Sequence, residues 1–148
     1  MEEAAGKIYN MQKSILITGA STGIGRALAF EFSPRGYALG LCARRMELLE
    51  SLRDELGGET QVAIARLDVA ELESVPEVLH KLADELGGVQ IVIANAGVGE
   101  RSYPGEGTFH LDRKVIEINV LGAGQAKQAG QEICFFPTNT AGDDATQE

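Results

Sequence analysis

The chain has 148 residues, of which 44% are hydrophobic, a length and composition typical of one globular domain with a sizeable core. Its formal net charge is -9 and it has no cluster of Lys and Arg, so nucleic acids and membrane surfaces are not expected as partners. No apolar run approaches the roughly 20 residues of a membrane span, and the acidic N-terminus is unlike a signal peptide, which favours a cytoplasmic protein. The two cysteines, Cys42 and Cys134, do not suggest a disulfide framework.

Predicted strands and helices alternate along the chain. Apolar segments predict strands at residues 14–18, 37–43, 61–67 and 89–94. Helices are predicted through Ile24, Leu28 and Phe32 as far as Pro34, through Leu48, Leu49, Leu52 and Leu56 as far as Gly57, and at 72–86 and about 109–121. This alternation predicts an α/β fold in which right-handed crossovers build a parallel sheet.

Both ends of the chain differ in character from the region between them. Residues 1–10 precede an ordinary start at Met11, and we expect them to form a disordered extension. Beyond Gly122 the sequence becomes small and polar, with no legible fifth strand and helix, so 123–148 is predicted to be an irregular, non-native tail. The alternative is that residues 133–136, a brief apolar patch, add a short edge strand.

A glycine-rich turn joins the first predicted strand to the first helix. Gly19, Gly23 and Gly25 follow the pattern T-G-x-x-x-G-x-G, in which side chains would obstruct a tight turn, an approaching pyrophosphate, or helix packing. The helix that follows points its first amides at the same place, where an anion can bind. The turn therefore predicts a dinucleotide phosphate site, and the alternative is a simple strand-to-helix turn.

The end of the second strand bears on the choice of nucleotide. NAD-binding folds usually place Asp or Glu there to bind the ribose 2'-hydroxyl, whereas a 2'-phosphate needs cations. This chain has Arg44 and Arg45 and no acid, and the planar guanidinium of Arg44 suits bidentate phosphate contact. NADP(H) is therefore favoured over NAD(H), with Arg45 either a helper or a solvated residue of the next helix.

From about residue 11 to residue 122 the sequence resembles the N-terminal half of a short-chain dehydrogenase/reductase, a family of NAD(P)-dependent Rossmann oxidoreductases. The resemblance is carried by Thr18–Gly25, Asp68–Val69, Asn95–Gly97 and Asn119. It implies a doubly wound parallel sheet truncated after about four strands, in the order 3-2-1-4, and a nucleotide cofactor. The predicted cofactor-binding residues are Gly19, Ser21, Thr22, Gly23, Ile24, Gly25, Arg44, Asp68, Val69, Asn95, Ala96 and Gly97.

Some of these residues also have simpler explanations. The family places Asp68 beside the adenine, but an Asp at the end of a strand can equally cap the next helix. Asn95 can serve only to hold the end of the sheet, which itself shapes the cofactor pocket. Thr22 argues against NADP(H), because many NADP-binding relatives carry a basic residue at that position.

The resemblance stops short of the family's complete catalytic group. Asn119 matches the helical asparagine of the tetrad, whereas the expected Ser and Tyr-x-x-x-Lys are absent beyond it, where 123–148 contains no Tyr. Tyr9 and Lys13 match the spacing but precede the first strand, and Tyr103 has Gly107 in place of the Lys, so neither is predicted to act. His80 and His110 have no further ligand at metal spacing, and no metal site is expected.

Three interpretations of function follow. The first is an inactive, NADP(H)-binding remnant of an oxidoreductase of carbonyl or alcohol substrates, and the second is a working NADP-dependent reductase. The third is the non-folded product of a frameshifted gene, since the abrupt change after Gly122 resembles a shift of reading frame. If the chain folds, homo-oligomerisation is expected to cover part of the exposed sheet.

Overall fold

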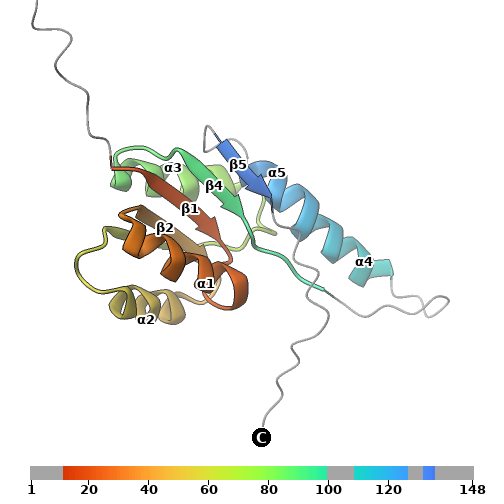
Figure 1. Ribbon diagram of the computed structural model, residues 1–148. Coiled ribbons are helices and arrows are strands. Elements are labelled where there is room, and N and C mark those ends of the chain that lie inside the picture. Colours follow the sequence, from red (N-terminus) through yellow and green to blue (C-terminus); the bar gives the residue numbers. More distant parts are fainter. Residues whose placement is uncertain (1–11, 100–108, 127–131, 136–148) are drawn as a thin grey trace, which may run out of the picture.

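The computed structural model describes residues 12–99, 109–126 and 132–135, and it contains one five-stranded parallel sheet in the order β3-β2-β1-β4-β5 (Figure 1). The strands are β1 (Ser14–Thr18), β2 (Ala38–Ala43), β3 (Val62–Arg66), β4 (Ile91–Ala94) and β5 (Glu132–Phe135). The predicted parallel class and the order 3-2-1-4 are confirmed for the first four strands. Each of these four strands begins and ends within two residues of its predicted bounds, because the apolar runs are short and flanked by glycine or polar residues.

Helices connect these strands. They are α1 (Gly23–Phe32), the short 3-10 helix η1 (Ser33–Arg35), α2 (Met46–Leu56), α3 (Ser74–Leu86), α4 (Phe109–Ile116), the π-helical turn η2 (Glu117–Gly122) and α5 (Ala123–Ala126). The last three follow one another without a break, so the helix predicted at 109–121 extends a further five residues to Ala126. Gly57 and Gly87 follow α2 and α3 with φ of 81° and 75°, a backbone conformation that favours glycine and ends a helix.

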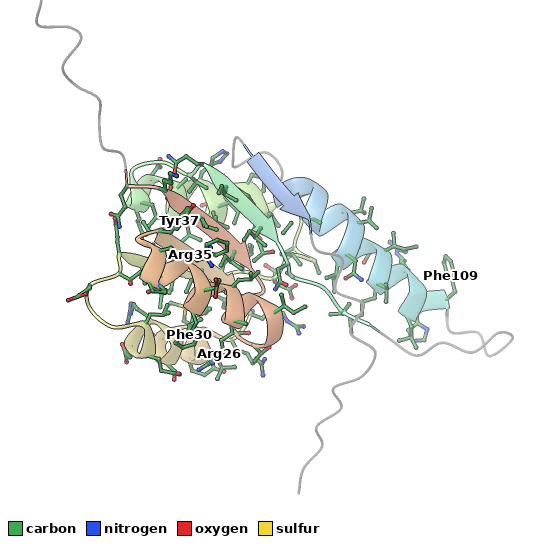
Figure 2. All side chains as sticks on the ribbon, in the orientation of Figure 1. Arg26, Phe30, Arg35, Tyr37 and Phe109 are labelled. Atoms are coloured by element: carbon green, nitrogen blue, oxygen red, sulfur yellow. The ribbon has the colours of Figure 1, made fainter. Side chains whose placement is uncertain are left out.

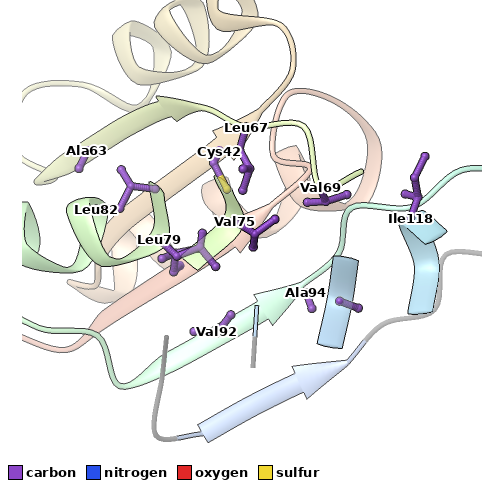
Figure 3. Packing of buried hydrophobic residues seen from close by; sticks show 12 residues of the cluster. Cys42, Ala63, Leu67, Val69, Val75, Leu79, Leu82, Val92, Ala94 and Ile118 are labelled. Carbon is purple, nitrogen blue, oxygen red and sulfur yellow. The ribbon is translucent and has the colours of Figure 1, made fainter. Parts of the chain in front are cut away.

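Apolar helix faces cover both sides of the sheet. On one side Ile15, Ile17 and Leu41 pack with Leu49 and Leu52 of α2 and with residues of α1. On the opposite side Leu16, Cys42 and Val92 form a cluster with α3 and with the segment η2–α5. Figure 3 shows Cys42 and Val92 within this cluster. All five residues of β1 are buried, as expected for a central strand of a doubly covered parallel sheet.

The fifth strand corrects part of the sequence prediction. Residues 123–148 were predicted to be irregular, but 123–126 are helical and Glu132–Phe135 pairs in parallel with β4, with Ile91 opposite Glu132. The alternative edge strand at 133–136 is thus confirmed with a shift of one residue. The physical reason is that β4 would otherwise present unpaired backbone groups at an apolar sheet edge. The extension predicted at 1–10 and the remainder of the predicted tail lie outside the described residues.

No helix within these described ranges is long and apolar enough to cross a lipid bilayer.

Candidate cofactor site

The predicted site residues gather where the carboxyl ends of the strands meet (Figure 1). The glycine-rich turn follows β1, Arg44 follows β2, Asp68 follows β3 closely, and Asn95 follows β4. Because all these strands are parallel, the segments after them share one edge of the sheet. Ligands of such sheets bind at this edge, between neighbouring strands whose connections leave in opposite directions. Here those strands are β1 and β4.

Each glycine of the turn has a different role. Gly19 has φ of 68°, and a Cβ on it would lie 2.7 Å from the Cα of Ala96, so this glycine closes the turn against the segment after β4. At Gly25 a Cβ would lie 2.4 Å from the carbonyl oxygen of Gly19, so this glycine lets α1 pack on the turn. Gly23 has φ of 57° and is exposed, and its Cβ would meet nothing within 4 Å. Gly23 therefore borders open space at the surface.

The N-terminus of α1 faces the same open space. Thr22 precedes the helix in an extended conformation, and its side chain makes no capping hydrogen bond to the described residues. The first turn also carries no acidic residue. Its leading amides are therefore available, and with the positive end of the helix dipole they favour an anion such as a pyrophosphate.

Asn95 fastens the glycine-rich turn to the end of β4. Its buried side chain donates from Nδ2 to the carbonyl oxygens of Thr18 and Gly19, at 3.1 and 3.2 Å. The backbone amide of Ala96 returns a hydrogen bond to Thr18 Oγ1 at 3.0 Å. Asn95 Oδ1 is buried and accepts no hydrogen bond from the described residues. Buried polar atoms are usually paired, so this oxygen is available to accept a hydrogen bond from a donor outside the described residues.

Asn119 fixes the next few residues of the same segment. Its Oδ1 accepts a hydrogen bond from the amide of Val98 at 2.8 Å, and its Nδ2 donates to the carbonyl oxygen of Val98 at 2.9 Å. The sequence pattern points to Asn119 but not to its partner Val98, because a contact between residues 21 apart has no local signal. Thr18 was also missed as a site residue, although it begins the glycine pattern.

At the far end of the site, β2 is followed by cations and β3 by a tight turn. Arg44 and Arg45 are exposed, and neither makes a hydrogen bond or ion pair with the described residues. The half-buried Asp68 accepts the amide of Ala70 at Oδ1 over 3.0 Å, which closes a local turn. Glu73, not Asp68, precedes the first residue of α3, so the helix-capping alternative for Asp68 is wrong.

The histidines and the buried cysteine of the described residues bear on possible metal or thiol chemistry at this edge. The residues that the structure describes contain no group of three or more His, Cys, Asp or Glu side chains able to hold a metal ion, and His80 and His110 are both exposed. Burial raises the pKa of the Cys42 thiol to about 12, so the thiolate needed for nucleophilic or metal-binding chemistry does not form near neutral pH. Tyr9 and Tyr103 lie outside the described residues.

Comparisons with known proteins agree with this geometry. The short chain dehydrogenase family model matches residues 13–133. An uncharacterized oxidoreductase of Mycobacterium tuberculosis (strain ATCC 25618 / H37Rv) is 42% identical over 115 residues, which cover 76% of this chain and 46% of that protein. The NADPH-dependent pterin aldehyde reductase of Arabidopsis thaliana is 36% identical over 111 residues, which cover 74% of this chain and 46% of the reductase.

A solved structure shows the same relationship. The alcohol dehydrogenase of the archaeon Thermococcus sibiricus, complexed with 5-hydroxy-NADP, superposes with a TM-score of 0.75 at 39% identity, over 79% of this chain and 51% of the dehydrogenase. The chain spans about half the length of the curated relatives it matches. From the family match over most of its length and the shared architecture, the chain belongs to the short-chain dehydrogenase family.

Proposed function

We propose that this chain binds NADP(H) at the carboxyl edge of its sheet. The observation that carries the proposal is the open space at Gly23, which the uncapped N-terminus of α1 faces and which has no side chain within 4 Å of an added Cβ. A phosphate group fits such a cradle because backbone amides and the helix dipole both favour negative charge. The residues present therefore fit the pyrophosphate of a dinucleotide.

Each part of the nucleotide has residues proposed to hold it. The amides and side chains of Ser21, Thr22 and Ile24 line the pyrophosphate side of the turn, where Ile24 is exposed. Asp68 and Val69 are proposed to lie beside the adenine. The segment Asn95–Gly97 is proposed to border the nicotinamide, because it passes over Gly19. The bound nucleotide would supply or accept a hydride.

A preference for the phosphorylated nucleotide rests on charge. Arg44 and Arg45 follow β2 with no ion-pair partner among the described residues, and the end of this strand has no acid to accept a ribose 2'-hydroxyl. Guanidinium groups pair well with phosphate. Two relatives support this preference by their names, since the Arabidopsis reductase is NADPH-dependent and the Thermococcus dehydrogenase is complexed with 5-hydroxy-NADP.

We do not expect the 148-residue chain alone to transfer a hydride at an enzymatic rate. Proton transfer from a positioned side chain typically contributes about 10²- to 10⁴-fold to such a reaction. Both polar side-chain atoms of Asn119 are occupied by Val98, and no Tyr follows Asn119 in the sequence. The alternative function is an NADP-dependent reduction of a carbonyl, or the reverse oxidation of an alcohol, and one relative is by name an NADPH-dependent pterin aldehyde reductase.

Self-association is a further part of the proposal. Phe109, Ile116, Val120 and Leu121 are exposed along α4 and η2, and a second copy would cover such apolar surface.

A reducing, cytoplasmic environment is proposed for the chain because Cys42 is free and buried.

Isothermal titration calorimetry of the full chain with NADPH and NADH tests the binding proposal. We expect saturable binding of NADPH and at least tenfold weaker binding of NADH. Equal affinities would contradict the role of Arg44, and no heat with either nucleotide from protein that circular dichroism shows to be folded would contradict the function itself.

Oxidation of NADPH in the presence of several aldehydes and ketones tests the catalytic part. We expect no turnover above buffer. Turnover that persists in Tyr9→Phe and Tyr103→Phe would establish the alternative function, whereas its loss in Tyr9→Phe would show that the Tyr9–Lys13 pair acts.

A further inference from the structure

Gly122, the last residue of η2, lies directly against the turn after β3. A Cβ on Gly122 would lie 2.8 Å from the carbonyl oxygen of Val69 and 3.0 Å from its Cβ. Both residues are buried. Because the nearest atom is backbone, the contact has no flexible side chain that can yield, and only glycine permits the approach.

The same helical turn also holds the segment after β4. Asn119, three residues before Gly122, makes its two hydrogen bonds to the backbone of Val98 from within η2. Ile118 is buried in one cluster with Val69 and Ala94, and Figure 3 shows its side chain near the ends of these segments. One turn of helix therefore contacts the segments after β3 and β4 at once.

The π-helical form of η2 helps to explain how one turn can reach both segments. Hydrogen bonds in a π-helix run from residue i to i+5, which widens the turn, and such turns occur frequently at functional sites. Widening changes the angle between the directions of Asn119 and Gly122 around the helix axis. Here the amide side chain reaches Val98 while the glycine backbone reaches Val69.

We propose that Gly122 is a positioning residue that sets the distance between the adenine half and the nicotinamide half of the cofactor site. This inference rests on the proposed function, in which Asp68 and Val69 border the adenine and the segment after β4 borders the nicotinamide. A dinucleotide must contact both halves at once, so its affinity depends on their spacing. A mononucleotide fragment contacts one half and does not depend on it.

The test compares Gly122→Ala with Gly124→Ala in the full chain. The second change is a matched control, because Gly124 is also helical and a Cβ on it would meet nothing within 4 Å. Calorimetry is performed with NADPH and with adenosine 2',5'-bisphosphate, which carries the adenine, its ribose and the 2'- and 5'-phosphates but no nicotinamide. We expect Gly122→Ala to bind NADPH at least tenfold more weakly and the bisphosphate within threefold of wild type, with both unchanged in Gly124→Ala.

A merely structural role would give a different result, since partial unfolding lowers the affinity for both ligands in parallel. A parallel loss, or equal behaviour of the two glycine variants, would overturn the inference. Should Gly122→Ala fail to fold, Asn119→Ala cuts the other contact of the same turn, and the same selective loss of NADPH binding is expected. Loss of both ligands together, or of neither, in folded Asn119→Ala would be evidence against it.

Amide NMR spectra separate this inference from the proposed function. If neither ligand binds wild type, the proposed function fails, but the amides of Ala70 and Val98 still report on the two segments in the free protein. We expect Gly122→Ala to shift both amide resonances, relative to Gly124→Ala. A shift confined to Ala70 would mean that η2 does not link the two segments, and the inference would be wrong.

Discussion

The region from β1 to β4 and the segment α4–η2 differ in how their exposed aromatic side chains are covered. In the region from β1 to β4, Phe30 of α1 is 37% exposed, and the guanidinium of Arg26 stacks on its ring at 4.9 Å from the centroid (Figure 2). Phe109 at the start of α4 is 74% exposed, and the described residues provide no cation over its ring. Ile116 and Val120 continue the apolar surface, at 54% and 58% exposed.

The difference lies in how the apolar surface of each region is covered. Helices α1 and α2 cover one face of the sheet, and α3 together with η2–α5 covers the other, so the strands of the nucleotide edge stand on a core that is covered on both sides. Among the described positions of α4 and η2, Ile118 and Gly122 are the buried ones. The proposed phosphate site is therefore expected to be insensitive to changes on the outer face of α4, and the predictions below test that separation.

The largest effect is expected for Gly19→Val. A β-branched residue at φ of 68° is strained by about 1–3 kcal/mol, and its Cβ also collides with the backbone of Ala96. We expect lower thermal stability and loss of binding for both NADPH and NADH by calorimetry. Gly58→Ala is the control, because its Cβ would meet nothing within 4 Å. Unchanged affinity in Gly19→Val would mean that the turn does not shape the nucleotide site.

Core truncation should separate the two regions clearly. Leu49→Ala removes a fully buried side chain of α2 and is expected to lower the free energy of unfolding by about 2–5 kcal/mol. Ile116→Ala, on the exposed face of α4, is expected to change it by less than about 1 kcal/mol. Urea denaturation followed by circular dichroism measures both. Comparable losses would show that the outer face of α4 is buried in solution, as self-association would produce.

A smaller effect, on the affinity for NADPH, is expected for Arg44→Ala. Loss of a charged hydrogen bond to the 2'-phosphate should weaken NADPH binding by about 1–3 kcal/mol and leave NADH unaffected. Arg53→Ala, on the exposed surface of α2, removes the same charge and serves as the control. Equal weakening by the two variants would indicate a general charge effect without a specific contact.

The smallest effect is expected at the surface ion pair between α1 and α2. Arg26 Nη2 lies 2.5 Å from Glu55 Oε2, and this hydrogen bond lowers the pKa of the Glu55 carboxyl. A carboxyl with a lowered pKa in the folded state stabilises the fold above its unfolded pKa, and the contribution disappears as pH falls through the folded value. The free energies of unfolding of wild type and Glu55→Gln, measured by urea denaturation, should therefore differ slightly at about pH 7 and converge as the pH falls below the pKa of Glu55 in the folded state. A constant difference would exclude this ion pair as the cause.

The sequence allowed the first four strands to be predicted because each is a local apolar run with a glycine, proline or polar residue at its end. β5 was missed as the preferred prediction, since four residues give too little pattern and its pairing with β4 is a long-range event. The glycine pattern likewise located the strand-to-helix turn after β1 but not which residues each of its glycines approaches. That Gly19 contacts Ala96, and Gly122 contacts Val69, depends on approaches between segments distant in the chain.

The central place of β1 in the sheet has a consequence for synthesis of the chain. β1 is made first, and its edge toward β4 remains unpaired until β4 follows, as the hydrogen bond between Ser14 and Gln90 across 76 residues illustrates. At about 5–20 residues per second, that interval lasts on the order of 4–15 seconds. During it the nascent chain carries an apolar strand with one open edge, which is the kind of segment that ribosome-associated chaperones shield.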